Sequence, residues 1–131
     1  MALKKVKRKA ISQNPKVMLL YGAPKVGKTT ALSQLDDCLI IDTVGGANML
    51  DGYIEEAKSR EDLINILKEA KDGHDYKYVA IDTIDKIATW AEHTVCQEEQ
   101  VSAVQDLAFG KGFGMVREKV LNTVNALKEI F

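Results

Sequence analysis

Residues 21–30 read "YGAPKVGKTT", and this stretch decides the fold. It matches the pattern G-x-x-x-x-G-K-[ST] at Gly22, Gly27, Lys28 and Thr29. In such a loop the glycines let the backbone wrap an anion, and N–H groups and the positive end of the following helix point at it. The apolar run "KVMLLY" (16–21) precedes the loop and a helical stretch follows it. This order predicts a buried strand, a phosphate-binding loop and a helix.

The residue types in the loop also predict a metal. Lys28 can bring its ammonium to the terminal phosphates of a nucleotide, and the Thr29 hydroxyl is a ligand for Mg²⁺. A Mg²⁺–nucleotide site also needs a carboxylate at the end of a neighbouring apolar strand. Asp82 closes the run "YVAI" and fits that place, with helix capping as its alternative role.

Hydrolysis would need a further group to orient the attacking water. Asp42 ends the second expected strand and Asp85 lies one helical turn after Asp82, so each is a candidate for that role. For both Asp42 and Asp85, capping or a place in a solvated helix start is an equally good explanation. Lys25, inside the loop, is a candidate for an additional cation. The candidate catalytic residues are Lys28, Asp82, Asp85 and Asp42.

The rest of the chain alternates strand and helix patterns. We expect strands at 16–21, 38–42 and 76–82, and helices at 28–35, around Met49 to Ala57, at 60–72, within 83–100 and within 115–131. The triplet "IDT" closes two of the strands, at 41–43 and 81–83, and "AFGKGFG" (108–114) reads as a mobile loop before the last helix. Because parallel strands need crossover connections, this alternation predicts an α/β fold with a mainly parallel sheet covered on both faces.

Composition and charge narrow the class of protein. With 131 residues, 46% of them apolar and 28% charged, the chain fits one ordinary globular domain. It has no apolar run of about 18 residues, and no apolar stretch follows the basic start, so we expect neither a membrane span nor a secretion signal, and a cytoplasmic location. Residues 1–30 carry eight Lys or Arg and no acid. That charge suits the phosphates of a nucleotide or a nucleic acid, or serves solubility.

Four stretches together carry a family resemblance: "YGAPKVGKTT", "LIIDTVGGANMLDGY", "YKYVAIDTIDKI" and "FGKGFGMV". The sequence resembles the RecA-type ATPase core, and more narrowly the phage-encoded nucleotide-binding proteins of the Sak group, which are associated with single-strand annealing and recombination. The resemblance covers 15–131, leaves 1–14 as a basic N-terminal segment, and implies a three-layer αβα P-loop fold that binds ATP and Mg²⁺. It implies metal contacts at Thr29 and Asp82, and nucleotide contacts at Gly22, Ala23, Pro24, Lys25, Val26, Gly27, Lys28, Thr29 and Thr30.

Two departures from the family pattern affect these expectations. Proteins of this type generally read "IDTEGG", whereas this chain has Val44 in place of the glutamate, and valine cannot orient water or accept its proton. RecA-type sheets also place a further strand, after the last helix, between the strand before the loop and the strand ending at Asp82. This chain stops at Phe131. Either it is a truncated product with an incomplete sheet, or 16–21 pairs directly with 77–82, as in kinase-type P-loop proteins.

Three functions remain open from the sequence. The first is a phage-type ATP-binding protein that acts on single-stranded DNA as a homo-oligomer, with the phenylalanines of 108–114 stacking on bases and Lys111 meeting phosphate. A glycine hinge with phenylalanines in the core is the alternative for that loop. The second is a small-molecule phosphotransferase, for which the three dispersed arginines give no lid. The third is a nucleotide-binding regulator or remnant without turnover, which Val44 favours.

Overall fold

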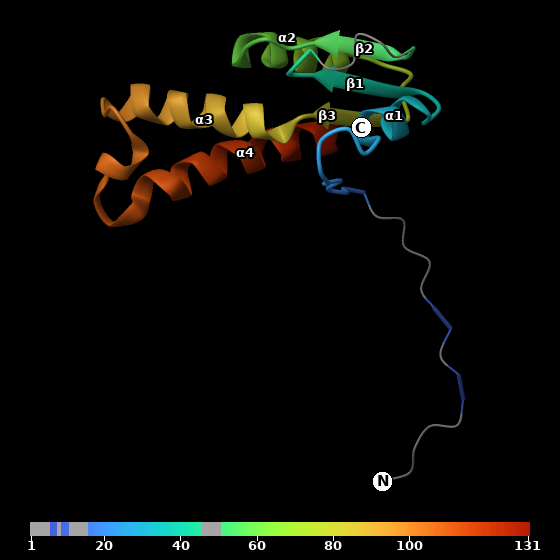
Figure 1. The fold of residues 1–131 in the computed structure, drawn as a ribbon, viewed down its shortest axis with the longest axis horizontal. Coiled ribbons are helices and arrows are strands. Elements are labelled where there is room, and N and C mark those ends of the chain that lie inside the picture. The colour runs from blue at the N-terminus through green and yellow to red at the C-terminus, as the bar shows by residue number, and fades with distance from the viewer. Residues whose placement is uncertain (1–5, 8, 11–15, 46–50) are drawn as a thin grey trace.

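The computed structural model describes residues 6–7, 9–10, 16–45 and 51–131. In these ranges three strands form one parallel sheet in the order β2-β1-β3, with helices around it (Figure 1). The predicted α/β class with a parallel sheet is confirmed. The elements are α1 (Lys28–Ser33), β1 (Cys38–Asp42), β2 (Tyr53–Glu56), α2 (Arg60–Asp72), β3 (Tyr78–Asp82), α3 (Ile84–Glu99), the 3₁₀ turns η1 (Val104–Asp106) and η2 (Ala108–Gly110), and α4 (Lys111–Ile130).

The central strand β1 carries the core. All five of its residues are buried, as expected for a strand with a neighbour on each side and cover on its faces. Leu39 and Ile41, which share one face of β1, pack in a cluster of buried residues with one apolar side chain from each long helix. The helix residues of this cluster are Leu63 from α2, Ile87 from α3 and Leu127 from α4.

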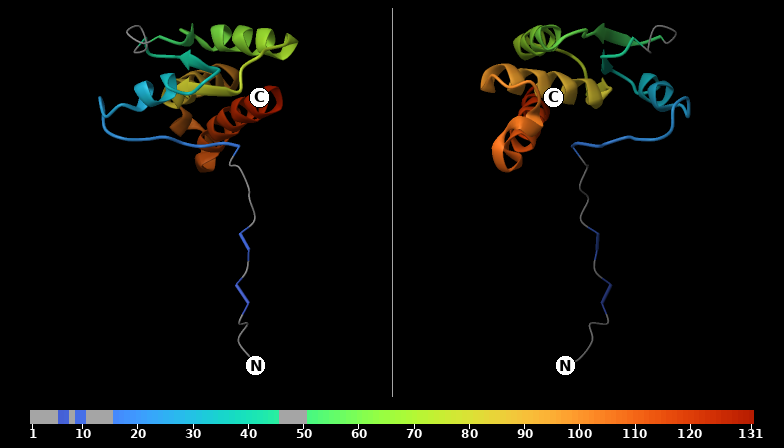
Figure 2. Two further views of the ribbon diagram at one scale, coloured as in Figure 1. Left: turned by 90° about the vertical axis from the view of Figure 1, so that its right-hand side faces the viewer. Right: turned by 60° about the vertical axis from the view of Figure 1, so that its left-hand side comes forward.

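Helices α3 and α4 lie side by side and extend well beyond the sheet, and η1 and η2 join them at the far end (Figures 1 and 2). We call this unit the α3–α4 hairpin and its far end, residues 101–113, the hairpin tip. Within the described ranges, none of the helices is long and apolar enough to cross a membrane.

Several expected elements are confirmed because local signals and tertiary packing agree. The strand at 38–42 and the helix at 60–72 have the predicted bounds. Ser59 and Asp62 have the three-residue spacing of a capping box, and at the start of α2 the Ser59 hydroxyl accepts a hydrogen bond from the Asp62 backbone N–H at 3.2 Å. The third strand begins two residues later than expected, at Tyr78.

The predicted strand at 16–21 is wrong. This segment is described and forms no strand, and its side chains are exposed, from 47% for Leu20 to 85% for Tyr21. An apolar run indicates only that side chains favour burial; a strand also needs a neighbour for its backbone N–H and C=O groups. Among the described residues β3 pairs with β1 alone, so the direct pairing of 16–21 with 77–82 is wrong too.

Two other expectations need correction. The helix expected around Met49 to Ala57 is replaced at its described end by strand β2, Tyr53–Glu56, which pairs with the edge of β1; Met49 lies outside the described residues. A sheet edge thus overrides a weak helical pattern. The expected mobile loop 108–114 is also wrong in part, because α4 already begins at Lys111. Its first residues are helical since Gly112 packs directly on Val104 of η1.

Candidate functional site

The phosphate-loop motif forms a tight turn into α1. Gly27 caps the helix with a φ of 101°, and Lys25 within the turn also has a positive φ of 62°. Gly27 has the conformational freedom that such a backbone angle requires. The Lys28 ammonium folds back across the turn and donates hydrogen bonds to the carbonyl oxygens of Gly22, at 2.5 Å, and Ala23, at 3.2 Å. The cation therefore already lies inside the loop.

Thr29 and Asp82 meet although 53 positions separate them in the chain. The Thr29 hydroxyl donates a hydrogen bond of 2.6 Å to the Asp82 carboxylate, and both side chains are half-buried. Asp82 is the last residue of β3, and the next residue, Thr83, takes the N-cap position of α3. The capping role considered for Asp82 is therefore wrong. A hydroxyl and a carboxylate are placed together as two hard oxygen donors, the kind that Mg²⁺ prefers.

The two "IDT" triplets end neighbouring strands in register. Ile41 pairs with Ile81 and Asp42 with Asp82 in the parallel ladder. Beyond this pair, the backbone N–H of Thr43 donates to the Asp82 carbonyl at 2.8 Å. The Thr43 hydroxyl accepts from the Thr83 N–H at 2.7 Å and donates to the Thr83 carbonyl at 3.0 Å. The carboxyl ends of β1 and β3 are thus joined one residue past the regular ladder.

Asp42 is turned toward its own backbone. Its Oδ1 accepts hydrogen bonds from the N–H groups of Val44, at 3.0 Å, and Gly45, at 2.8 Å, so the side chain closes the turn after β1. Only 2% of Asp42 is exposed. For Asp42 the geometry supports the capping alternative, and the segment that it caps is the turn after β1.

Asp85 and Val44 lie at the same edge of the sheet with open surroundings. Asp85 is exposed in the first turn of α3, where a negative charge favours the helix dipole. In the described part of the chain no hydrogen bond or ion pair joins its carboxylate to Lys28 or Thr29. Val44 follows Thr43, the residue that joins the ends of β1 and β3, and its side chain is 52% exposed. The position where the resemblance places a water-orienting acid therefore holds an apolar, accessible side chain.

Sequence reasoning brought Thr29 and Asp82 together but missed Thr43 and Thr83. The signal that could have found them is the repeat of "IDT", since two identical strand ends in parallel neighbours place equivalent residues side by side. Only the register shows that one threonine hydroxyl spans both backbone groups of the other threonine.

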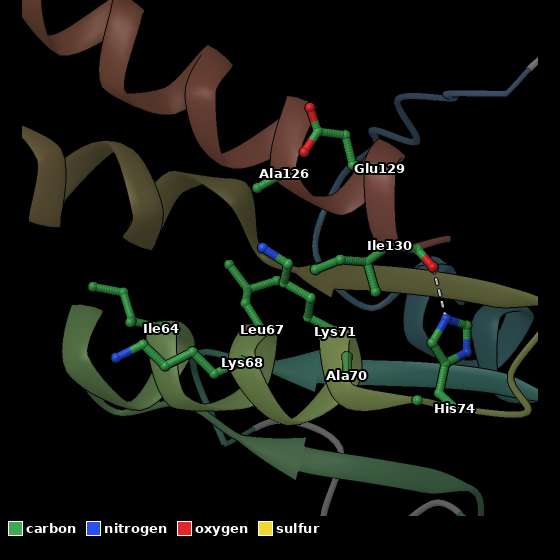
Figure 3. Close-up of a pocket in the computed structure, with 10 residues that line it drawn as sticks. Ile64, Leu67, Lys68, Ala70, Lys71, His74, Ala126, Glu129 and Ile130 are labelled. Carbon is green, nitrogen blue, oxygen red and sulfur yellow. Dashed lines mark hydrogen bonds between the residues drawn. The ribbon is translucent and has the colours of Figure 1, made fainter.

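A pocket of about 510 Å³ lies away from this edge, between α2 and α4 (Figure 3). Leu67 of α2 and Ile130 of α4 line it from opposite sides, and the side chain of Lys71 reaches from α2 into the space between the two helices. His74 closes one end by a 2.7 Å hydrogen bond from its Nε2 to the Ile130 carbonyl, and its ring stacks on Phe131 at 4.0 Å. None of the residues that line this pocket belongs to the phosphate loop.

Comparison with known proteins agrees with the geometry of the loop. A family model described as "AAA domain" matches residues 14–130, which include the loop, the paired strand ends and α4. No curated protein and no solved structure matched the chain. AAA-type P-loop ATPase domains generally bind ATP with Mg²⁺. A match over most of the length, with the loop and its carboxylate in place, shows that the chain belongs to the AAA domain family of P-loop nucleotide-binding proteins.

Proposed function

We propose that residues 22–30 and Asp82 bind ATP with Mg²⁺. The observation that carries this proposal is the 2.6 Å hydrogen bond between the Thr29 hydroxyl and the Asp82 carboxylate. The motif supplies the loop, but only the fold could bring a strand-end carboxylate to the threonine that follows the lysine. This pair is the donor set that a Mg²⁺–triphosphate site requires.

The residues present fit such a ligand. Thr29 would contribute its hydroxyl to Mg²⁺, and Asp82 would hold the water shell of the metal. Lys28 would exchange the carbonyl oxygens of Gly22 and Ala23 for phosphate oxygens, and the N–H groups at the start of α1 are turned toward the loop. When bound, Mg²⁺ supplies neutralising charge for the β- and γ-phosphates. The protein's part is to hold the phosphates and orient them.

We further propose that the site binds ATP far better than it hydrolyses it. Val44 has no polar atom in its side chain, and the Asp42 carboxylate is engaged with the turn after β1. Val44 cannot orient a water molecule, and one carboxylate oxygen of Asp42 already accepts two backbone N–H groups. Asp85, three residues after Asp82, is exposed and is the acid nearest to Asp82 along the chain. On this proposal the site keeps its grip on phosphate, while the position after the first "IDT" triplet offers no group to activate water.

Single-turnover hydrolysis of ATP tests both statements. Wild type, Lys28→Ala and Val44→Glu are compared, with Val44→Gln as a matched control that is polar but cannot take a proton. We expect Mg²⁺–ATP binding without appreciable phosphate release for wild type, no binding for Lys28→Ala, and a gain of hydrolysis for Val44→Glu only. Tight binding with no gain in Val44→Glu would reject the missing-acid explanation. Phosphate transfer to a nucleoside or small metabolite would favour a phosphotransferase instead.

A second proposed function is binding of single-stranded DNA at the hairpin tip. The side chain of Phe109 is fully exposed and that of Phe113 is 57% exposed, so the alternative in which both are core residues does not hold. Lys111 lies between them in sequence and is exposed. Exposed aromatic rings beside a cation are the groups that stack on bases and meet phosphates.

The start of α4 packs closely on η1, and Phe109 lies between these two segments in sequence. A Cβ added at Gly112 would lie 2.5 Å from the Val104 carbonyl oxygen, so the start of α4 packs against η1 at backbone distance. Phe109 itself has a φ of 58°, an unusual angle for a bulky residue. This geometry holds the ring in solvent, where a partner can reach it.

Oligonucleotide binding measured against salt tests the tip. Phe109→Ala should weaken binding of a single-stranded oligonucleotide by about tenfold, whereas Leu121→Ala, an exposed apolar residue on the shaft of α4, should leave it unchanged. Lys111→Ala should lower the salt dependence. Absence of binding at low salt, with and without ATP, would reject DNA as the partner.

A further part of the proposed function concerns the narrower family of the protein and its assembly. We propose that residues 15–131 form a RecA-like three-layer nucleotide-binding domain after a basic segment at 1–14, and that the protein is a phage-type member of the Sak group acting in recombination as a homo-oligomer. The family match at 14–130 supports the nucleotide-binding domain, and the exposed aromatic tip supports the role on DNA. Size measurement with and without ATP and oligonucleotide tests the oligomer.

A further inference from the structure

The Thr43 side chain is bound on two sides by one neighbouring residue. Its hydroxyl accepts the Thr83 N–H at 2.7 Å and donates to the Thr83 carbonyl at 3.0 Å, while its own N–H donates to the Asp82 carbonyl at 2.8 Å. The residue is 8% exposed. Three hydrogen bonds from one residue therefore hold the backbone directly at and after Asp82.

A hydroxyl is required for this arrangement. It is the small side-chain group that can donate one hydrogen bond and accept another at a single atom. Valine has the shape of threonine but neither capacity, whereas serine retains both. Regular parallel pairing ends at Asp42 and Asp82, so without the hydroxyl the backbone N–H and C=O of Thr83 lose these partners.

What the hydroxyl fixes is the point from which the Asp82 side chain projects. The carboxylate of Asp82 reaches Thr29 across the edge of the sheet, and a shift of its backbone would move the carboxylate away from that hydroxyl. Lys28 and the loop amides belong to a different segment and make no hydrogen bond with Thr43 among the described residues. Their grip on phosphate is independent of Thr43.

We propose that Thr43 is a positioning residue for the magnesium part of the site. It touches neither nucleotide nor metal; it acts through Asp82, by holding the peptide that comes after that residue. This inference rests on the proposed Mg²⁺–ATP site. Thr43 of the first "IDT" triplet would thus set the position of the Asp82 carboxylate in the second triplet.

A purely structural role for Thr43 would have a different signature. Simple loosening of the strand ends would lower stability and weaken nucleotide binding alike in the presence and absence of Mg²⁺. A positioning role lowers only the gain in affinity that Mg²⁺ provides. The ratio of ATP affinities in Mg²⁺ and in EDTA is therefore the informative quantity.

The experiment measures ATP affinity of the full chain by calorimetry in Mg²⁺ and in EDTA, for wild type, Thr43→Val, Thr43→Ser and Thr94→Val. Thr94→Val is a matched control because it removes a half-buried threonine hydroxyl that bonds a carbonyl, that of Trp90, on α3. We expect Thr43→Val to lower the Mg²⁺/EDTA ratio about tenfold with little change in EDTA. Thr43→Ser and Thr94→Val should keep the wild-type ratio.

Each other outcome contradicts the inference in its own way. An unchanged ratio in Thr43→Val, or an equal loss in Thr43→Ser, would show that the hydroxyl does not position Asp82. If Thr43→Val does not fold by circular dichroism, Thr43→Ala is measured in its place, and failure of both to fold would assign the hydroxyl to the fold as a whole. Absence of ATP binding by wild type would instead reject the proposed function.

Discussion

The two strand ends that read "IDT" have the same three letters and opposite roles. Asp42 bends back to the backbone of its own chain, at Val44 and Gly45, and is buried. Asp82 points across to Thr29 of the phosphate loop and is half-buried. The next element of the chain explains the difference, because a glycine turn comes after the first triplet and a helix after the second. Identical local sequence thus becomes a turn in one place and a candidate metal position in the other.

The largest expected effect separates the two aspartates by their chemistry. Asp82→Ala should lower ATP affinity in Mg²⁺ by about a hundredfold, or about 2.7 kcal/mol, because it removes one of the two hard oxygen donors of the proposed Mg²⁺ site, and should leave affinity in EDTA nearly unchanged. Calorimetry in both buffers checks this. The matched control is Asp75→Ala, an exposed aspartate before β3. Equal affinities for Asp82→Ala and wild type in Mg²⁺ would break the comparison.

For Asp42 we expect a loss of stability and no change in the effect of Mg²⁺ on ATP affinity. Asp42→Ala removes the acceptor of two backbone N–H groups at a buried position, so its free energy of unfolding should fall by about 2 kcal/mol. Urea unfolding measures this loss. The Mg²⁺/EDTA ratio of ATP affinities should stay close to that of wild type. A protein of full stability that had lost its response to Mg²⁺ would show that Asp42, rather than Asp82, serves the metal.

The glycine turn after the first triplet is expected to matter less. Gly45 has a φ of +79°, which a residue with a Cβ adopts at a cost, so Gly45→Ala should lower the free energy of unfolding by about 1 kcal/mol. Gly52→Ala is the control, since a Cβ there would lie 4.0 Å from its nearest neighbour, Ile54, and its φ is not in the left-handed range. Equal losses in the two variants would mean that the turn is not what directs Asp42.

The smallest expected effect concerns the burial of the Cys38 thiol in β1. Burial raises the pKa of the Cys38 thiol above its ordinary value of 9.0. The unfolded chain therefore loses this proton first as pH rises, and the stability contributed by the protonated thiol is present below pH 9.0 and declines above it. The difference in unfolding free energy between wild type and Cys38→Ala should accordingly shrink between about pH 8 and pH 10, by urea unfolding at each pH. A difference independent of pH would place the thiol in contact with water.

The sequence allowed the site to be predicted better than its surroundings. The predicted bounds of β1 and α2 agree with local signals that the tertiary structure retains: Gly45 follows β1, and Ser59 and Gly73 cap α2. Thr29 and Asp82 were brought together because a sheet places the ends of parallel strands at one edge. Such predictions succeed where a motif already encodes the geometry.

The predictions failed where the structure of a segment depends on which strand it pairs with. By composition 16–21 is the better strand candidate and 53–56 falls in a predicted helix, yet 53–56 is the segment that pairs with the edge of β1. The role of Thr43 depends on a register that places its hydroxyl between two backbone groups of Thr83. Neither the choice of edge nor the register is encoded within a short window of sequence.

The arrangement of α3 gives the strand end a mechanical consequence. Helix α3 starts two residues after Asp82 and runs for 16 residues, about 24 Å, toward the hairpin tip, where Phe109 lies in the separate turn η2. A tilt of about 5° at the first turn of α3 would displace its last turn by about 2 Å. A change in the direction of the helix at the strand end would therefore appear, enlarged, at the hairpin tip.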